Sequence, residues 1–262
     1  LFSANGLQNL FAHIENSGKK LNENGQRMLR LKQSYIRTID PVISFLHDKN
    51  PTLAHVIAEQ NYLPEASRFQ QVSDLEWAFG SMGVRDKARH LATLYLEDIS
   101  DLIIDAVDPH FGFSRYAERL GRSASSFQEL NQALNAPLTY IDELLIDILK
   151  AKIEAEKPDL VAITAPFPGN LYSALRCGQW IKKHHPAIKV AFGGGYANTE
   201  LRSLQEPRVF EFVDFITLDD GETPLMNLLD HLKSTRELKD LKRTFCCIEG
   251  TVTYLNGSKD SD

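Results

Sequence analysis

The sequence predicts an α/β protein in which a mostly helical region precedes an open, mainly parallel sheet. Before Pro158, apolar residues recur at the three- and four-residue spacing of helices, and few segments have the character of strands. After Pro158, short apolar runs alternate with helical segments, which is the order of a parallel sheet built with right-handed crossovers. We therefore expect a helical region, as an insertion or an N-terminal part, at residues 1–157, an α/β module at 158–255 and a polar tail at 256–262.

The composition narrows the classes of function. The chain has 262 residues, a formal net charge of -6, 43% hydrophobic and 24% charged residues, which disfavours long disorder. No apolar stretch approaches the roughly 18 residues of a membrane span and no signal peptide is recognised, so we expect a cytoplasmic protein without a membrane partner. The mild acidity argues against a nucleic-acid partner. The 3 Cys suit a reducing compartment and are too few for a disulfide framework.

The helical region contains several segments with helical periodicity. Residues 7–14 place their apolar side chains on one face. A longer helix is expected over 24–47, and Pro41 should kink or divide it because proline lacks a helical donor. Further features are expected, in order, as a short helix from Pro51, helices at 75–79 and 88–104, a turn at 108–112, a helix cap at Ser125–Gln128 and a helix at 140–156.

The helix predicted over 140–156 has the clearest amphipathic pattern in the chain. Its apolar residues form one stripe and its charged residues lie elsewhere. The stripe consists of Ile141, Leu144, Leu145, Ile148 and Leu149.

The α/β module begins with a short apolar run of the type found in buried strands. The later runs follow the same pattern, and the last two, separated by Glu249-Gly250, predict a closing hairpin. We expect the polar tail to be frayed. The predicted strands are 160–164, 188–192, 212–217, 244–248 and 251–255, and the predicted helices are 171–183, 199–204 and 224–232.

Three loops follow predicted strands at the edge where open parallel sheets bind ligands. In the first, Thr164 ends its strand with a hydroxyl group, and the loop either lines a ligand or caps its own helix through Asn170. The third contains Asp219, Asp220 and Glu222, which suit a metal ion or a ribose and equally suit a helix N-terminus. The three loops are 164–170, 193–200 and 218–224.

The second loop opens with Gly193, Gly194 and Gly195. Consecutive glycines let a ligand approach the backbone, and a helix starting near Asn198 or Thr199 would point free amides into the same space. This arrangement suits a phosphate or a nucleotide tail, while a tight turn without a ligand explains the glycines equally well. No CxxC or CxxxCxxC spacing occurs, so neither a zinc nor an iron–sulfur site is predicted.

Taken together, the three loops resemble the N-terminal cobalamin-binding region of B12-dependent radical SAM proteins of the Fe–S oxidoreductase type. The resemblance covers residues 157–233 and is closest to a subgroup with Asp-Asp-Gly-Glu at 219–222. The stretch 108–116 also resembles that subgroup. The motifs are a strand that ends in Thr after Pro-Asp, a Gly-Gly-aromatic segment and a Gly-Glu segment, which here are Lys157–Thr164, Gly193–Glu200 and Phe215–Leu225.

The resemblance implies a Rossmann-like (flavodoxin-like) module that holds cobalamin, with its nucleotide tail in the crevice at the carboxyl ends of the strands. The first loop would line the tail or the corrin, the glycines and Tyr196 would approach the tail and its phosphate, and Glu222 would be structural as much as ligand-binding. The implied cofactor-binding residues are Thr164, Pro166, Phe167, Gly169, Asn170, Gly193, Gly194, Gly195, Tyr196, Asn198, Thr199, Asp219, Gly221 and Glu222.

The resemblance also implies a partner, the radical SAM domain of the same polypeptide, with a [4Fe-4S] cluster and S-adenosylmethionine for radical or methyl-transfer chemistry. The cluster motif Cys-x-x-x-Cys-x-x-Cys is absent here, so we expect no catalytic residue in this chain alone. The Asp-x-His-x-x-Gly motif that supplies a cobalt ligand is also absent. The family's first strand is not found before Leu1, and we expect a fragment whose sheet lacks that strand.

Two other functions stay open at this point. One is an enzyme that binds a nucleotide or a phosphosugar through the glycine loop and uses Asp219 or Glu222. The other is an interaction module whose α/β part has lost its ligand. No residue pattern indicates an oligomeric state.

Overall fold

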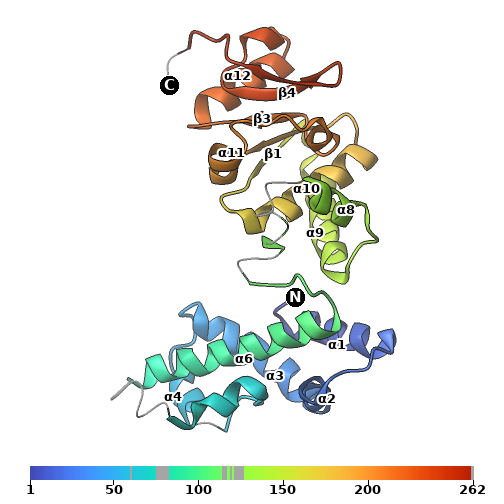
Figure 1. The fold of residues 1–262 in the computed structure, drawn as a ribbon. Coiled ribbons are helices and arrows are strands. Elements are labelled where there is room, and N and C mark those ends of the chain that lie inside the picture. The colour runs from blue at the N-terminus through green and yellow to red at the C-terminus, as the bar shows by residue number, and fades with distance from the viewer. Residues whose placement is uncertain (60, 75–82, 114–116, 119, 121–126, 261–262) are drawn as a thin grey trace. The chain divides into compact units, whose positions relative to one another are not determined.

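The structure, a computed structural model, divides into two compact units, Leu1–Gly112 and Phe113–Asp262 (Figure 1). It describes residues 1–59, 61–74, 83–113, 117–118, 120 and 127–260, without the side chains of 71–74. The change of sequence character at Pro158 lies inside the second unit. The helix expected at 75–79, the cap residues 125–126 and positions 114–116 lie outside the described residues.

The first unit consists of helices in the part that the structure describes. Two of them begin with a side-chain cap: Ser3 accepts a hydrogen bond from the Gly6 amide, and Asn22 accepts one from the Gly25 amide. The longest helix packs against α2, α3, α4 and η1. The elements are α1 (Ala4–Ser17), α2 (Glu23–Arg30), α3 (Lys32–Leu46), α4 (Leu53–Ala58), the 3-10 helix η1 (Ser67–Asp74) and α6 (Val84–Ala106).

The helix predicted over 24–47 divides at Leu31 and not at Pro41. Pro41 lies inside α3, which continues to Leu46. Ile39 and Val42, on either side of the proline, are fully buried. Their packing holds the helix together across the one hydrogen bond that proline cannot donate.

A buried carboxylate joins the start of η1 to α6. Asp98 is fully buried and accepts hydrogen bonds from the backbone amides of Ala66 and Arg68, at 3.1 and 3.0 Å. Burial raises the pKa of Asp98, because its desolvation outweighs these two bonds, which favour the charged form. The guanidinium group of Arg68 binds both oxygens of Asp101 one turn away, at 2.6 and 2.8 Å.

The second unit is an α/β structure with a five-stranded open sheet in the order β1-β2-β3-β4-β5. The first three strands are parallel and the last two are antiparallel to their neighbours, so the sheet is mixed. The strands are β1 (Leu160–Thr164), β2 (Lys189–Gly193), β3 (Phe215–Thr217), β4 (Thr244–Ile248) and β5 (Thr251–Leu255). The other elements are α8 (Phe127–Asn135), α9 (Tyr140–Glu156), α10 (Pro168–His184), α11 (Gly195–Glu200), η2 (Pro207–Glu211), α12 (Glu222–Leu232) and η3 (Leu238–Asp240).

Local sequence patterns predict most of these strands. The strand 160–164 and the closing hairpin are confirmed. Glu249 and Gly250 both have positive φ, of 51° and 79°, as a two-residue hairpin turn of type I′ requires. The strand predicted at 212–217 begins only at Phe215, because the preceding chain closes the 3-10 helix η2.

Different helices pack against the two faces of the sheet. The first, which we call the α10 face, carries the larger core, where Phe192 and Ile216 pack with residues of α8, α9 and α10. The second, the α12 face, carries a smaller core around Leu228 of α12. On this face Ala162 and Thr164 of β1 are exposed, although parallel strands are normally covered on both faces.

A buried ion pair ties three helices of this unit together. The guanidinium of Arg176 lies 3.2 Å from the carboxylate of Asp142, and their side chains are 2% and 1% exposed. Tyr172 donates to Asp142 and accepts from Arg176, at 2.9 and 2.6 Å. Arg176 also donates to the carbonyl oxygens of Leu134 and Ala133, at 2.6 and 3.0 Å. One side chain of α10 therefore holds the end of α8 and the start of α9.

The same ion pair explains why α9 turns an unexpected stripe to the core. The buried residues of α9 are Asp142, Ile146 and Ile153, and Ile148 of the predicted stripe is 65% exposed. Asp142 must point at Arg176, and this requirement sets the rotation of the helix. The predicted helix over 140–156 is confirmed. Of its apolar stripe, Ile141, Leu144, Leu145, Ile148 and Leu149, only Leu149 is among the residues that pack against the larger core.

The tail is held in place as far as Asp260, so the expectation of a frayed end is wrong for residues 256–260. Asp260 accepts hydrogen bonds from Asn227 at 2.8 Å and from Arg236 at 2.6 Å. The bond from Asn227 and the charge of Arg236 lower the pKa of this carboxyl. The Gly257 amide donates to the Leu241 carbonyl at 3.0 Å.

We predict that Arg176→Ala lowers the free energy of unfolding of the second unit by about 3–5 kcal/mol, because it leaves the Asp142 carboxylate buried and unpaired. Urea denaturation followed by circular dichroism measures the change. The double variant Arg176→Met with Asp142→Asn removes both charges and should recover part of the loss. An Arg176→Ala protein as stable as the wild type would contradict this role of the pair.

Candidate functional site

A groove of ≈ 290 Å³ lies on the α12 face at the carboxyl ends of the parallel strands. Residues from β1, β2 and β3 line it, and the start of α12 borders it. We call it the α12 groove. Its lining residues are Ala162, Ile163, Thr164, Ala191, Phe192, Gly193, Gly194, Thr217, Gly221, Glu222 and Leu225.

The α12 groove brings together residues from all three predicted loops. Thr164 comes from the first loop, Gly193 and Gly194 from the second, and Gly221 and Glu222 from the third. They meet because the carboxyl ends of parallel strands share one edge of the sheet. These positions are the part of the predicted site that forms one surface.

Sequence reasoning missed the floor of the groove. Ala162 and Ala191 are small residues inside strands, and Leu225 lies on the first turns of α12. Thr217 was recognisable, because it ends β3 with a hydroxyl group as Thr164 ends β1. The small floor residues gave no such signal, since alanine in a strand is usual in any core.

The other predicted residues do not line this groove. Phe167 precedes α10 and is 67% exposed, and Gly169 is buried within the first turn of α10. Tyr196 is buried in the core of the α10 face, and burial raises the pKa of its hydroxyl to about 12. The predicted residues outside the lining are Pro166, Phe167, Gly169, Asn170, Gly195, Tyr196, Asn198, Thr199 and Asp219.

Backbone packing requires two of the three consecutive glycines. A Cβ atom on Gly194, whose φ is +101°, would stand 2.8 Å from the Ala165 carbonyl oxygen. A Cβ atom on Gly195 would stand 2.7 Å from the Pro166 carbonyl oxygen. Both distances are shorter than real contacts, so the first and second loops touch through their backbones only because these positions are glycines.

The start of α11 differs from the prediction, and this affects the amides there. The helix begins at Gly195, before the expected start at Asn198 or Thr199. The Tyr196 amide in its first turn already donates to the Ala165 carbonyl at 3.0 Å. That amide therefore holds the first loop and is not directed at a ligand.

Asp219 belongs to a polar connection between the second and third loops. Its backbone has a φ of 58°, in the left-handed region, and its amide donates to the Asn198 side chain. The Asp219 carboxylate forms an ion pair with Arg202 and lies 3.9 Å from the guanidinium of Arg243. These contacts explain both Asn198 and Asp219 as residues that fix the loops beside the groove.

The lining of the α12 groove is mostly apolar and has one charge. Glu222 is exposed in the first turn of α12, where the helix dipole favours an acid. The other polar side chains are the hydroxyls of Thr164 and Thr217. A mostly apolar lining with two hydroxyl groups, a carboxylate and no cation suits an uncharged flat group better than an anion. Among the described residues, no group of three or more His, Cys, Asp or Glu could hold a metal ion.

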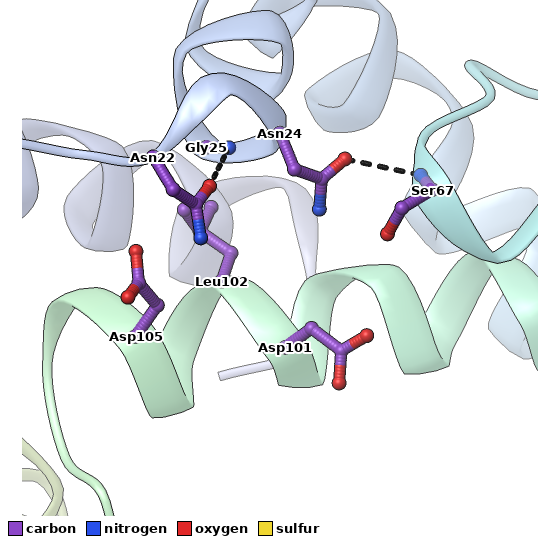
Figure 2. Close-up of a pocket in the computed structure, with 7 residues that line it drawn as sticks. All are labelled: Asn22, Asn24, Gly25, Ser67, Asp101, Leu102 and Asp105. Carbon is purple, nitrogen blue, oxygen red and sulfur yellow. Dashed lines mark hydrogen bonds between the residues drawn. The ribbon is translucent and has the colours of Figure 1, made fainter.

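The helical unit has a smaller polar pocket of ≈ 190 Å³ (Figure 2). The Asn24 side chain accepts a hydrogen bond from the Ser67 amide at 3.0 Å, and Asn22 caps α2. Asp101, on the opposite side, binds Arg68. These groups connect α2, η1 and α6, which is a structural role. The pocket is lined by Asn22, Asn24, Gly25, Ser67, Asp101, Leu102 and Asp105.

The chain was compared with known protein families, curated proteins and solved structures. No protein family, curated protein or solved structure matches the chain. In the part of the chain that the structure describes, no helix has both the length and the apolar character needed to cross a membrane. The residues and geometry of the α12 groove are therefore the basis for inferring function.

We predict that Gly194→Ala lowers the free energy of unfolding by about 2–4 kcal/mol, because the new Cβ meets the Ala165 carbonyl in a left-handed backbone conformation. Gly221→Ala is the matched control: its backbone is helical and nothing lies within 4 Å of the added Cβ. That control should change stability by less than about 0.5 kcal/mol. Urea denaturation of both variants measures the difference, and equal effects would refute the packing role of Gly194.

Proposed function

We propose that the second unit is the cobalamin-binding module of a radical SAM protein and that the α12 groove holds the nucleotide tail of the cofactor. One observation carries the proposal: a single groove at the carboxyl ends of parallel strands joins Thr164, Gly193 and Glu222, one residue from each motif of the resemblance. The parallel order β1-β2-β3, with helices between the strands, supports a Rossmann-like (flavodoxin-like) relationship as part of the same proposal.

The chemistry of the lining supports the aromatic base of the tail, more than its phosphate, as the group in the groove. Ala162 and Leu225 offer an apolar surface to a flat ring, and the hydroxyls of Thr164 and Thr217 meet its polar edge. No cationic side chain lines the groove, and the Tyr196 amide is engaged. In this proposal the phosphate lies outside the groove, toward solvent.

Bound cobalamin would supply methyl-transfer or radical chemistry in combination with a cluster and S-adenosylmethionine on a separate domain of the parent protein. The residues of this chain would bind and orient the cofactor. The Gly194 and Gly195 contacts would fix the loops, and the two threonines would select the base. Localisation in the cytoplasm, where thiols are reduced, is part of the proposal and agrees with three free cysteines.

A nucleotide-binding enzyme is the second candidate, and one observation favours it. Glu222 places an exposed carboxylate at the mouth of the α12 groove, where it suits the hydroxyl groups of a ribose. The two candidates differ in the ligand that the groove retains. They are therefore separated by the same binding measurement.

We expect purified protein to retain hydroxocobalamin in equilibrium dialysis at micromolar concentration, with a change in its visible absorption spectrum. Thr217→Val, which removes one hydroxyl without changing shape, should weaken retention about fivefold. Ala162→Phe, which fills the floor, should weaken it more than tenfold. Thr251→Val on the exposed surface of β5 is the matched control and should bind as the wild type does.

Two outcomes would decide against the cobalamin proposal. Absence of retention at high micromolar protein would reject it. Retention of AMP or ADP in the same dialysis, weakened by Ala162→Phe while hydroxocobalamin passes freely, would establish the second candidate in its place.

A further inference from the structure

The contacts that connect α2, η1 and α6 leave hydrogen-bonding groups unused on two opposite sides of the polar pocket. On the α2 side, the side-chain oxygen of Asn22 accepts a hydrogen bond from the Gly25 amide at 2.8 Å. The side-chain oxygen of Asn24 accepts one from the Ser67 amide at 3.0 Å. Because a backbone amide can only donate, these bonds fix the orientation of both asparagine side chains. Their NH₂ groups are directed toward α6 and have no hydrogen-bond partner among the described residues (Figure 2).

The α6 side of the same pocket presents two carboxylates. Asp101 is engaged, because both of its oxygens bind Arg68, at 2.6 and 2.8 Å. Asp105 lies one turn further along α6 and is half-buried, and its carboxylate forms no ion pair or hydrogen bond with any residue that the structure describes. The ammonium group of Lys19 binds the backbone carbonyl of Asp105 and not its carboxylate. One negative charge in the pocket is therefore left without a partner.

This arrangement of donors and acceptors disfavours two classes of ligand. A divalent metal ion takes about six oxygen ligands, whereas the groups that Asn22 and Asn24 turn to the pocket are NH₂ donors. An anion would be repelled by the carboxylate of Asp105. The lining matches a ligand that donates hydrogen bonds toward α6 and accepts them on the α2 side.

We propose that this pocket binds a small primary amine with an oxygen atom a few bonds from its ammonium group, as in amino alcohols and amino acids. The ammonium group donates to Asp105, and the oxygen accepts from the NH₂ groups of Asn22 and Asn24. Leu102, which is 1% exposed, provides the apolar part of the lining for the carbon atoms of the ligand. The volume of ≈ 190 Å³ suits a molecule of this size, because a cavity of about 150 Å³ holds benzene.

Isothermal titration calorimetry of the whole 262-residue chain with small probes tests the proposal. Ethanolamine carries both groups, n-propylamine has the same size without the oxygen, and ethylene glycol has the same size without the charge. We expect ethanolamine to bind at least tenfold more tightly than ethylene glycol, which cannot form the charged hydrogen bond, and about fivefold more tightly than propylamine. Serine, compared with ethanolamine, distinguishes an amino acid from an amino alcohol as the preferred ligand.

Variants assign the binding to this pocket. Asp105→Asn removes the unpaired charge and should weaken ethanolamine binding at least tenfold. Its circular dichroism should be unchanged, because that carboxylate holds no described element in place. Asp147→Asn removes the same charge from an exposed position on α9 and should bind ethanolamine as the wild type does. Asn22→Ser keeps a cap on α2 but removes one NH₂ group, and it should reduce the preference for ethanolamine over propylamine.

The result that overturns the proposal is different for each part of it. If neither ethanolamine nor serine binds at millimolar concentration, the pocket is not a site for amines. If ethanolamine and propylamine bind equally, the oxygen of the ligand is not recognised. If Asp105→Asn binds ethanolamine as tightly as the wild type does, the amine binds elsewhere on the protein. The pocket lies within the helical unit, so these measurements are independent of the ligand of the α12 groove.

Discussion

The arrangement of helices in the second unit depends on a buried ion pair. Arg176 and Asp142 give up water to meet inside the core, and replacing such a pair with apolar residues often costs nothing. The role of the pair is therefore to position helices, because the planar guanidinium group of Arg176 can bond to two helix ends at fixed angles. It is not fully satisfied, because Arg176 Nε and the second oxygen of Asp142 have no hydrogen-bond partner. These two unsatisfied groups cost free energy, and the same ion pair fixes α8 and α9 beside α10.

A second constraint follows at the sheet edge, where two loops touch through their backbones. The first loop lies on Gly194 and Gly195, and the third is joined to the second through Asn198 and Asp219. Because three loops are fixed against one another, the α12 groove keeps its shape without help from a ligand. Under the proposed function, the polar lining residues Thr164, Thr217 and Glu222 would select the ligand.

Local patterns predicted what depends on neighbours in the chain. The strand 160–164 is a short apolar run with Pro158 ahead of it, and the hairpin is set by the turn at Glu249 and Gly250. The rotation of α9 was not predictable, because it depends on the contacts of Asp142 with Tyr172 and Arg176; Tyr172 is 30 residues away in sequence and meets Asp142 only in the fold. The start of α11 was also misjudged: the glycines suited a ligand loop and a tight turn equally well, and only the fold shows that the backbones of Ala165 and Pro166 lie against Gly194 and Gly195.

The glycine run has a consequence for how related sequences should be compared. A protein that lost its ligand would still need Gly194 and Gly195, because any side chain there would push the two loops apart. Selection for folding alone would preserve them. The residues freest to drift after such a loss are Thr164 and Thr217, whose hydroxyl groups line the groove, whereas Glu222 also suits the first turn of α12. Glycines at these positions in a related sequence would therefore indicate a shared fold. The polar residues of the groove would indicate that the proposed ligand is still bound.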